Sequence, residues 1–172
     1  MPDQRPAADE HAPHHLKYID LCPTPIIDGL RSQRDEVDRL LRGIAEENAA
    51  FRYAPEKWSI RQVAGHLSDA ERIYNYRALS LARHDPTPLP PFDPDGYVEE
   101  AGFDARTMNS LADEFLAVRD NTISLFENLP AEAWSRRGTM GGQPLSVRAL
   151  AYIAYGHVAQ HVNVMRERYN VT

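Results

Sequence analysis

The stretch that decides the fold is residues 108–129, MNSLADEFLAVRDNTISLFENL. One set of positions recurs there in alternating steps of three and four, which is the period of a single face of an α-helix. The set is almost entirely apolar and consists of Met108, Leu111, Phe115, Val118, Thr122, Leu125 and Leu129. We therefore expect an amphipathic helix here, which Asp104 caps at its start and Pro130 closes.

Amphipathic segments also stand near both ends of the chain. The first begins at Thr24, whose hydroxyl can cap a helix, and Pro25 follows at the first helical position, where proline is favoured. This segment continues to about Ala50. The last begins at the capping residue Ser146 and continues to about Tyr169. Both segments carry apolar residues at three-to-four spacing, so each is expected to bury one face.

The clearest helix start in the sequence is at Ser59. Gln62 stands three residues later, so the two side chains can form a capping box. The helix should end near residues 83–85, because five prolines lie between residues 86 and 94. The chain from residue 84 to about residue 103 is then a long connection, which either crosses the bundle or covers a pocket.

Four amphipathic helices of similar length predict an all-α protein with the architecture of a four-helix bundle. A connection of roughly 19 residues can reach ~60 Å, whereas a helix of ~26 residues is ~39 Å long. The second and third helices can therefore run parallel, in an up-down-down-up order. Residues 1–18 are poor in apolar side chains and are expected to form a disordered tail, which leaves residues 19–172 as the bundle domain. No strand of consequence is expected, and Gly141-Gly142 predicts a turn.

The composition argues against several classes of protein. The net charge of −6 and the pI near 5.6 leave no basic excess to neutralise phosphates, so nucleic acid is not an expected partner. No run approaches the ~20 apolar residues of a membrane span, and the first residues lack the apolar core of a signal peptide. The single cysteine, Cys22, has no partner for an internal disulfide. These features predict a cytoplasmic protein that binds neither membrane nor nucleic acid.

Two histidines in the last expected helix have the spacing of a metal chelate. His157 and His161 are one turn apart, on the face that also carries Leu150, Ala154 and Met165. Imidazoles at this spacing can direct their nitrogens to one point that lies ~2.0–2.1 Å from each. Because both rings are expected to face inward, each loses hydration that a metal ion would replace.

His66 of the second helix is the third candidate ligand. It follows Val63 by one turn at the edge of the apolar face, so it can face the bundle interior. Three protein ligands with an open position are the arrangement of a catalytic zinc site, whereas a structural site uses four. The alternative to a metal site is that the three histidines are packed in the core without a metal ion. Asp69 and Glu71 could orient an imidazole or act as a base, but we expect them to be solvated carboxylates.

Two segments resemble the signature regions of the DinB-like (DinB/YfiT) superfamily of metal-dependent proteins. They are WSIRQVAGHLSDAE at residues 58–71 and GHVAQH at residues 156–161, and the resemblance extends over about residues 20–169. It implies a four-helix bundle with a long second connection, and often a homodimer. It also implies one divalent transition metal, zinc or nickel, bound by His66, His157 and His161. Known enzymes of the superfamily include transferases and isomerases that use low-molecular-weight thiols.

A metal ion with an open position can support more than one reaction. It stabilises a thiolate, as a thiol-dependent S-transferase needs, and it lowers the pKa of a bound water molecule, as a hydrolase needs. A dimeric bundle in which the metal serves stability or ligand sensing is the non-catalytic alternative. We expect a metal-dependent enzyme with a small-molecule substrate. The preferred activity is that of an S-transferase with a low-molecular-weight thiol cosubstrate, and the alternative activity is that of a hydrolase.

Overall fold

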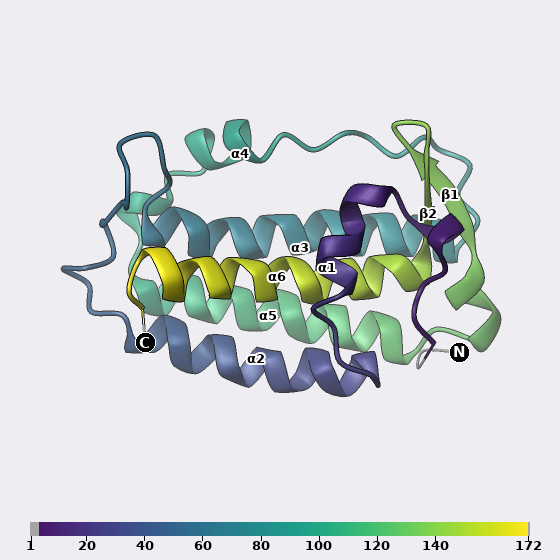
Figure 1. Ribbon diagram of the computed structural model, residues 1–172, viewed down its shortest axis with the longest axis horizontal. Helices are drawn as coiled ribbons and strands as arrows, with labels where there is room; N and C mark the ends of the chain where they lie inside the picture. Colours follow the sequence, from purple (N-terminus) through teal and green to yellow (C-terminus); the bar gives the residue numbers. More distant parts are fainter. Residues whose placement is uncertain (1–3, 172) are drawn as a thin grey trace.

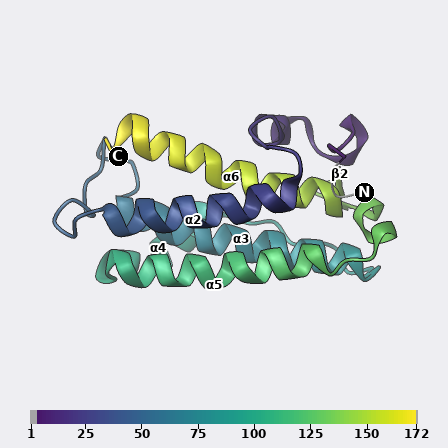
Figure 2. The ribbon, with the colours of Figure 1, turned by 90° about the horizontal axis from the view of Figure 1, so that it is seen from below.

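The computed structural model describes residues 4–171, and four long helices dominate it. They are α2 (Ile26–Gly43), α3 (Ile60–Ala82), α5 (Met108–Glu127) and α6 (Val147–Arg168). α5 packs against α2 and α3, and α6 packs against the same two helices, so the four enclose one interior (Figures 1 and 2). The predicted helical bundle is confirmed.

Two helix starts follow the sequence signals closely. Ser59 Oγ accepts the Gln62 N–H at 3.1 Å, and Gln62 Oε1 accepts the Ser59 N–H at 3.0 Å, which completes the capping box before α3. At the start of α6, Ser146 Oγ accepts the Ala149 N–H at 2.9 Å. Each bond satisfies an amide that has no partner within its helix. Both predicted caps are confirmed.

The bounds of α2 differ from the prediction. Pro25 rather than Thr24 occupies the N-cap, and no side chain caps this helix. α2 ends at Gly43 rather than near Ala50, and Ile44 already has extended backbone angles of φ −79° and ψ 118°. Glycine weakens a helix more than other residues except proline, which explains why the helix ends there.

The start of α5 also differs from the prediction. Its N-cap is Thr107, whose hydroxyl accepts the Ser110 N–H at 3.1 Å. The prediction that Asp104 caps this helix is wrong, because Asp104 lies in a preceding 3₁₀ turn and accepts the Ser59 hydroxyl at 2.5 Å. Its carboxylate therefore joins the approach to α5 with the start of α3.

The proline-rich connection between α3 and α5 is partly helical. It contains α4 (Pro94–Glu100), a short helix that was not expected from the sequence. α4 begins at a proline, which the first helical turn tolerates, and it packs against α3. In Figure 1 the connection runs along the bundle beside α3 before the chain enters α5. It therefore covers one side of the helix that carries His66.

A short antiparallel hairpin precedes α6. β1 (Arg137–Met140) pairs with β2 (Gln143–Ser146) around a turn at Gly141 and Gly142. Both glycines have positive φ angles, 58° and 76°, which residues with side chains rarely adopt. The predicted turn is confirmed, whereas the strands were not expected. Four residues are too few for an alternating pattern to stand out in a sequence.

Residues 4–18 pack against the bundle, in contrast to the disordered tail expected for residues 1–18. They form two 3₁₀ turns and lead into α1 (Leu16–Ile19), which packs against α6. Glu10 is 2% exposed, and its carboxylate accepts a bond from Arg148 of α6 at 3.2 Å. Specific long-range contacts of this kind hold the segment, and average composition does not reveal them. Residues 1–3 of the expected tail lie outside the described residues.

The close approach of α1 to α6 depends on a glycine. A Cβ atom at Gly156 would lie 2.0 Å from the carbonyl oxygen of Tyr18. We expect Gly156→Ala to displace α1 and to lower the free energy of unfolding by ~1–3 kcal/mol, the usual cost of overpacking. Urea denaturation measures the change. Gly43→Ala is the control, because a Cβ atom there meets nothing within 4 Å. Equal losses in the two variants would contradict this prediction.

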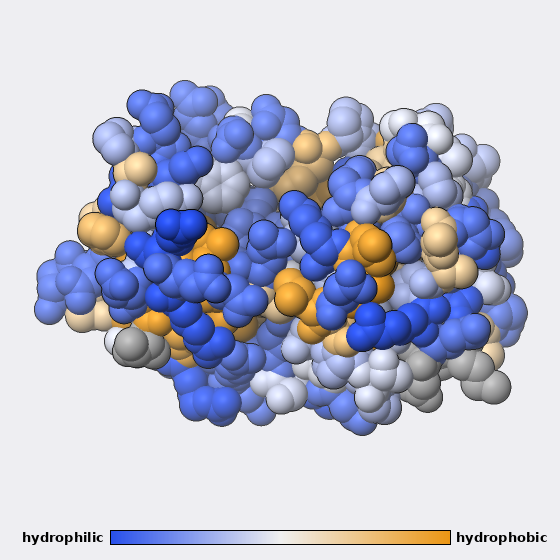
Figure 3. Space-filling view, viewed as in Figure 1, coloured by the Kyte–Doolittle hydropathy of each residue, from blue (hydrophilic) through white to orange (hydrophobic). Residues whose placement is uncertain are grey.

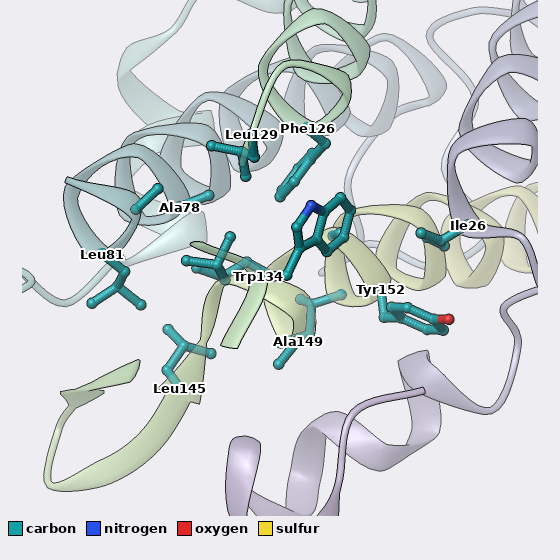
Figure 4. Close-up of a cluster of buried hydrophobic side chains, with 14 of the residues drawn as sticks. Ile26, Ala78, Leu81, Phe126, Leu129, Trp134, Leu145, Ala149 and Tyr152 are labelled. Carbon is teal, nitrogen blue, oxygen red and sulfur yellow. The ribbon is translucent and has the colours of Figure 1, made fainter. Parts of the chain in front are cut away.

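Two apolar clusters fill the bundle, one toward each end. The first joins the hairpin region to α3, α5 and α6, as Figure 4 shows, and it includes Ala78, Leu81, Phe126, Trp134, Leu145 and Tyr152. The second includes Val37, Leu67, Phe115, Val158 and Val162. On each long helix, polar buried side chains lie between the residues of the two clusters. The interior therefore has a polar layer across its middle.

A buried ion pair forms the centre of this polar layer. The side chains of Arg119 and Glu71 are 0% and 1% exposed, and two charge-assisted hydrogen bonds of 2.6 and 2.7 Å join them. Arg119 also donates to Gln33 Oε1 at 2.7 Å, and Gln33 donates to the Tyr155 carbonyl at 3.1 Å. These bonds link all four long helices. The expectation that Glu71 is a solvated carboxylate is wrong.

The face shown in Figure 3 is mainly hydrophilic, with apolar patches toward its middle. Exposed apolar side chains include Leu16 and Leu21, at 49% and 40% exposure. Within residues 4–171, no helix combines the length and apolar content that a crossing of a bilayer requires.

Candidate metal centre

Three histidine side chains from two helices converge inside the bundle. His66 lies on α3, and His157 and His161 lie one turn apart on the neighbouring helix α6. One ligand atom from each ring lies within 4.8 Å of the ligand atoms of the other two. The ring centroids are 5.0 Å apart for His66 with either partner and 4.6 Å apart for His157 with His161. The structure therefore brings together the three residues selected from the sequence.

The distance between two of the ring nitrogens suits a single metal ion. His66 Nε2 and His157 Nε2 are 3.1 Å apart. Two nitrogens at ~2.0–2.1 Å from one ion lie ~3 Å apart at a right angle and ~3.4 Å apart at a tetrahedral angle. Without an ion, the same distance fits a hydrogen bond between one protonated and one bare nitrogen. Imidazole nitrogen is also a ligand that both zinc and nickel bind.

Burial keeps the three imidazoles uncharged. His66 and His157 are 4% and 5% exposed, and His161 is half-buried. Burial lowers the pKa of His66 to about 3 and that of His161 to about 4, and it holds the pKa of His157 well below the usual 6.5. All three rings are therefore neutral at pH 7. A neutral imidazole has the free lone pair that a metal ion requires.

The His66 ring is held by aromatic packing. Trp58 lies against it with ring centroids 4.6 Å apart, and Phe92 of the proline-rich connection stacks parallel to it at 6.3 Å. Its Nδ1 atom is buried and has no hydrogen-bond partner among the described residues. In metal sites the nitrogen that does not bind the ion usually donates to a second group. In this protein, packing against Trp58 and Phe92 holds the His66 ring in place of such a hydrogen bond.

Two tyrosines contact the His157 ring edge to face. Tyr74 of α3 lies at 5.5 Å and Tyr18 of α1 at 5.7 Å between ring centroids. Tyr18 was not among the candidates from the sequence, because the segment before residue 19 was expected to be disordered. The N-terminal segment is thus part of the surroundings of the candidate site.

His161 is the candidate ligand that borders an opening. It forms part of the wall of a pocket of about 310 Å³, together with Tyr53, Trp58, Asp95 and Tyr169. Asp95 comes from α4, so the proline-rich connection contributes to this wall. Of the three histidines, only His161 lines this pocket.

The two carboxylates near His66 in the sequence do not join the histidines. Asp69 accepts a bond from Arg72 at 3.3 Å, and partial burial raises its pKa. Glu71 is engaged by Arg119 and Thr122. Neither carboxylate forms a hydrogen bond with an imidazole among the described residues, so a role in orienting the histidines finds no support.

The amino-acid sequence also matches a known family. The sequence model of the DinB superfamily matches residues 29–165, a span that contains all three histidines. The chain belongs to the DinB superfamily. The resemblance inferred from residues 58–71 and 156–161 is therefore confirmed. The match begins after α1, so α1 of this DinB superfamily member lies outside it. No curated protein matches the chain.

Two solved structures of Bacillus subtilis proteins are similar to this DinB superfamily member. YfiT, described as a probable metal-dependent hydrolase with an unusual four-helix bundle topology, has a TM-score of 0.73 and 12% identity, and the match covers 99% of this chain and 95% of YfiT. The DinB-like protein YjoA has a TM-score of 0.61 and 16% identity, with 84% and 89% covered. At these identities the similarity establishes a shared fold.

Proposed function

We propose that this protein is a metal-dependent enzyme that acts on a small molecule, with one divalent ion held by His66, His157 and His161. The observation that carries the proposal is the convergence of three ligand nitrogens from two helices within 4.8 Å. Three protein ligands leave a coordination position for water or substrate, as in catalytic zinc sites. An ion bound there supplies Lewis acidity and a nucleophile at neutral pH.

Aromatic side chains pack around the candidate metal ligands, and a pocket borders one of them. Trp58 and Phe92 fix the His66 ring, and Tyr18 and Tyr74 fix the His157 ring. The pocket that His161 and Trp58 both line would admit the substrate.

Hydrolysis is the reaction that we propose. It is supported by the fold shared with YfiT, which is described as a probable metal-dependent hydrolase. The alternative is S-transfer from a low-molecular-weight thiol, the activity implied by the superfamily resemblance, in which the ion would lower the pKa of the thiol. The pocket contains both aromatic and charged side chains, among them Tyr53, Glu56 and Lys57, which suits a small polar substrate.

Metal analysis and a substrate panel test the proposal together. Protein purified without a histidine tag should contain about one equivalent of zinc or nickel and should hydrolyse a member of a panel of small esters, amides and lactones. A chelator should abolish turnover, and the same ion should restore it. Turnover only in the presence of a thiol and an electrophile would identify an S-transferase. Metal at one equivalent that affects only the melting temperature would identify a non-catalytic bundle.

We also propose that the long helices follow an up-down-down-up order. Figure 1 supports this order, because α3 and α5 run in one direction there and α2 and α6 run in the other. We further propose a homodimer, which the superfamily resemblance implies. Sedimentation should then give twice the chain mass of 19.5 kDa.

A further inference from the structure

Aromatic side chains form part of the wall of the pocket that His161 borders. They are Tyr53, Trp58 and Tyr169. The Trp58 ring lies nearly parallel to the His161 ring, with an interplanar angle of 14° and ring centroids 6.5 Å apart. The aromatic wall therefore continues from a candidate metal ligand. At about 310 Å³, the pocket has room for a small organic group.

Two of these rings meet at a right angle. The planes of Tyr53 and Tyr169 are 87° apart, and their ring centroids are separated by 4.9 Å. The Tyr169 hydroxyl donates to the Trp58 carbonyl at 2.7 Å, which joins the end of α6 to the loop that carries Tyr53 and Trp58. We call Tyr53 and Tyr169 the aromatic corner. The faces of aromatic rings carry partial negative charge and attract cations.

Two carboxylates line the same pocket. Glu56 belongs to the loop before α3, and Asp95 belongs to α4. Neither carboxylate has an ion-pair or hydrogen-bond partner among the described residues. Several exposed carboxylates elsewhere pair with arginines, as Asp120 does with Arg34 at 2.5 Å. The carboxylates of the pocket are therefore free to meet a ligand.

The charges of the lining favour a cation. Two carboxylates stand against one ammonium group, that of Lys57. An organic cation would be attracted both by the carboxylates and by the aromatic faces, whereas both would repel an anion. An uncharged group of the same size would fit the walls but would gain nothing from the carboxylates.

We propose that this pocket binds the cationic group of the substrate, an organic ammonium group, in the aromatic corner. Glu56 and Asp95 supply the opposite charge. The identity of this ligand as a substrate rests on the proposed function, whereas cation binding itself does not. The substrate is then a small molecule whose reacting group meets the metal centre at His161 and whose ammonium group lies against Tyr53 and Tyr169.

Binding of a simple organic cation to the full chain tests the subsite, both as purified and after a chelator has removed metal. The probe is tetramethylammonium, which does not coordinate metal ions, and tert-butanol is its neutral counterpart of similar size and shape. Each probe has one methyl signal in proton NMR, and saturation transfer over a concentration series measures its affinity. Tetramethylammonium should bind about fivefold or more tightly than tert-butanol, as cation–π contacts predict.

Substitutions in the pocket identify the groups that hold the cation. Tyr53→Leu removes one aromatic face and should weaken binding of tetramethylammonium by about threefold or more. Tyr53 is 38% exposed in a loop, so this variant should fold, and Tyr53→Phe should retain the affinity. Asp95→Asn should weaken binding of the cation but not of tert-butanol. Tyr76→Leu is the matched control, because Tyr76 is 45% exposed on α3 and does not line this pocket.

The outcomes separate this subsite from the proposed function. Absence of tetramethylammonium binding, equal affinity for the two probes, or unchanged affinity in Tyr53→Leu or Asp95→Asn overturns the subsite, even if the protein binds one equivalent of metal and hydrolyses a substrate. Cation binding that Tyr53→Leu weakens and Tyr76→Leu does not, in a protein that binds no metal, supports the subsite and overturns the proposed function.

Discussion

His161→Ala is expected to lower the affinity of the protein for zinc or nickel by about 100-fold or more while the bundle remains folded. The substitution removes one of three ligand nitrogens. In metal sites, loss of a residue that only hydrogen-bonds to a ligand already lowers metal affinity by ~10–100-fold. His161 is half-buried and borders a pocket, so alanine should disturb the packing less here than at the fully buried His66 or His157. Calorimetric titration of the ion measures the affinity, and circular dichroism checks the helix content.

His14→Ala is the matched control for this variant. His14 is exposed in the N-terminal segment and does not belong to the converging group. It should bind the ion with the affinity of the wild type. If His161→Ala and His14→Ala lose affinity equally, or neither loses any, the assignment of His161 as a ligand is refuted.

Arg119→Met is expected to lower the free energy of unfolding by ~3–5 kcal/mol, the usual cost of breaking a buried ion pair on one side. The variant leaves the Glu71 carboxylate, whose side chain is 1% exposed, without its cation. It also removes the donor to Gln33 Oε1. Because these bonds link the four long helices, the loss should appear as one cooperative shift of the guanidinium denaturation curve at pH 7.

Two further variants isolate the cause of this loss. Glu71→Leu combined with Arg119→Met should recover much of the stability, because a bundle without either charge has no unpaired buried ion. Arg166→Met should cost at most ~1 kcal/mol, since Arg166 and its partner Glu36 are 46% and 40% exposed. A loss in Arg119→Met no larger than that in Arg166→Met would contradict a structural role for the buried pair.

Much of the bundle and all three candidate ligands could be predicted from local sequence signals. Ser59 and Ser146 are followed by periodic apolar residues, and such caps act through bonds to amides two or three residues away. His157 and His161 are four residues apart on one helix, so their proximity is also a local property. Only the proximity of His66 to the other two histidines required an assumption about which helices are neighbours.

The parts that could not be predicted depend on contacts between distant residues. Glu71 and Arg119 look like surface charges in a helical pattern, and their burial follows only from the pairing between α3 and α5. The N-terminal segment is polar on average, yet Glu10 and Gly156 attach it to α6. The contact of Tyr18 with His157 therefore could not be predicted from periodicity alone.

Anomalous diffraction from crystals grown with zinc or nickel would show directly whether the three imidazoles bind one ion. We expect a single strong anomalous peak ~2.0–2.2 Å from a nitrogen atom of each of His66, His157 and His161, with an open position toward the pocket that His161 borders. A peak elsewhere on the protein, or none between these rings in crystals that contain the ion, would contradict it.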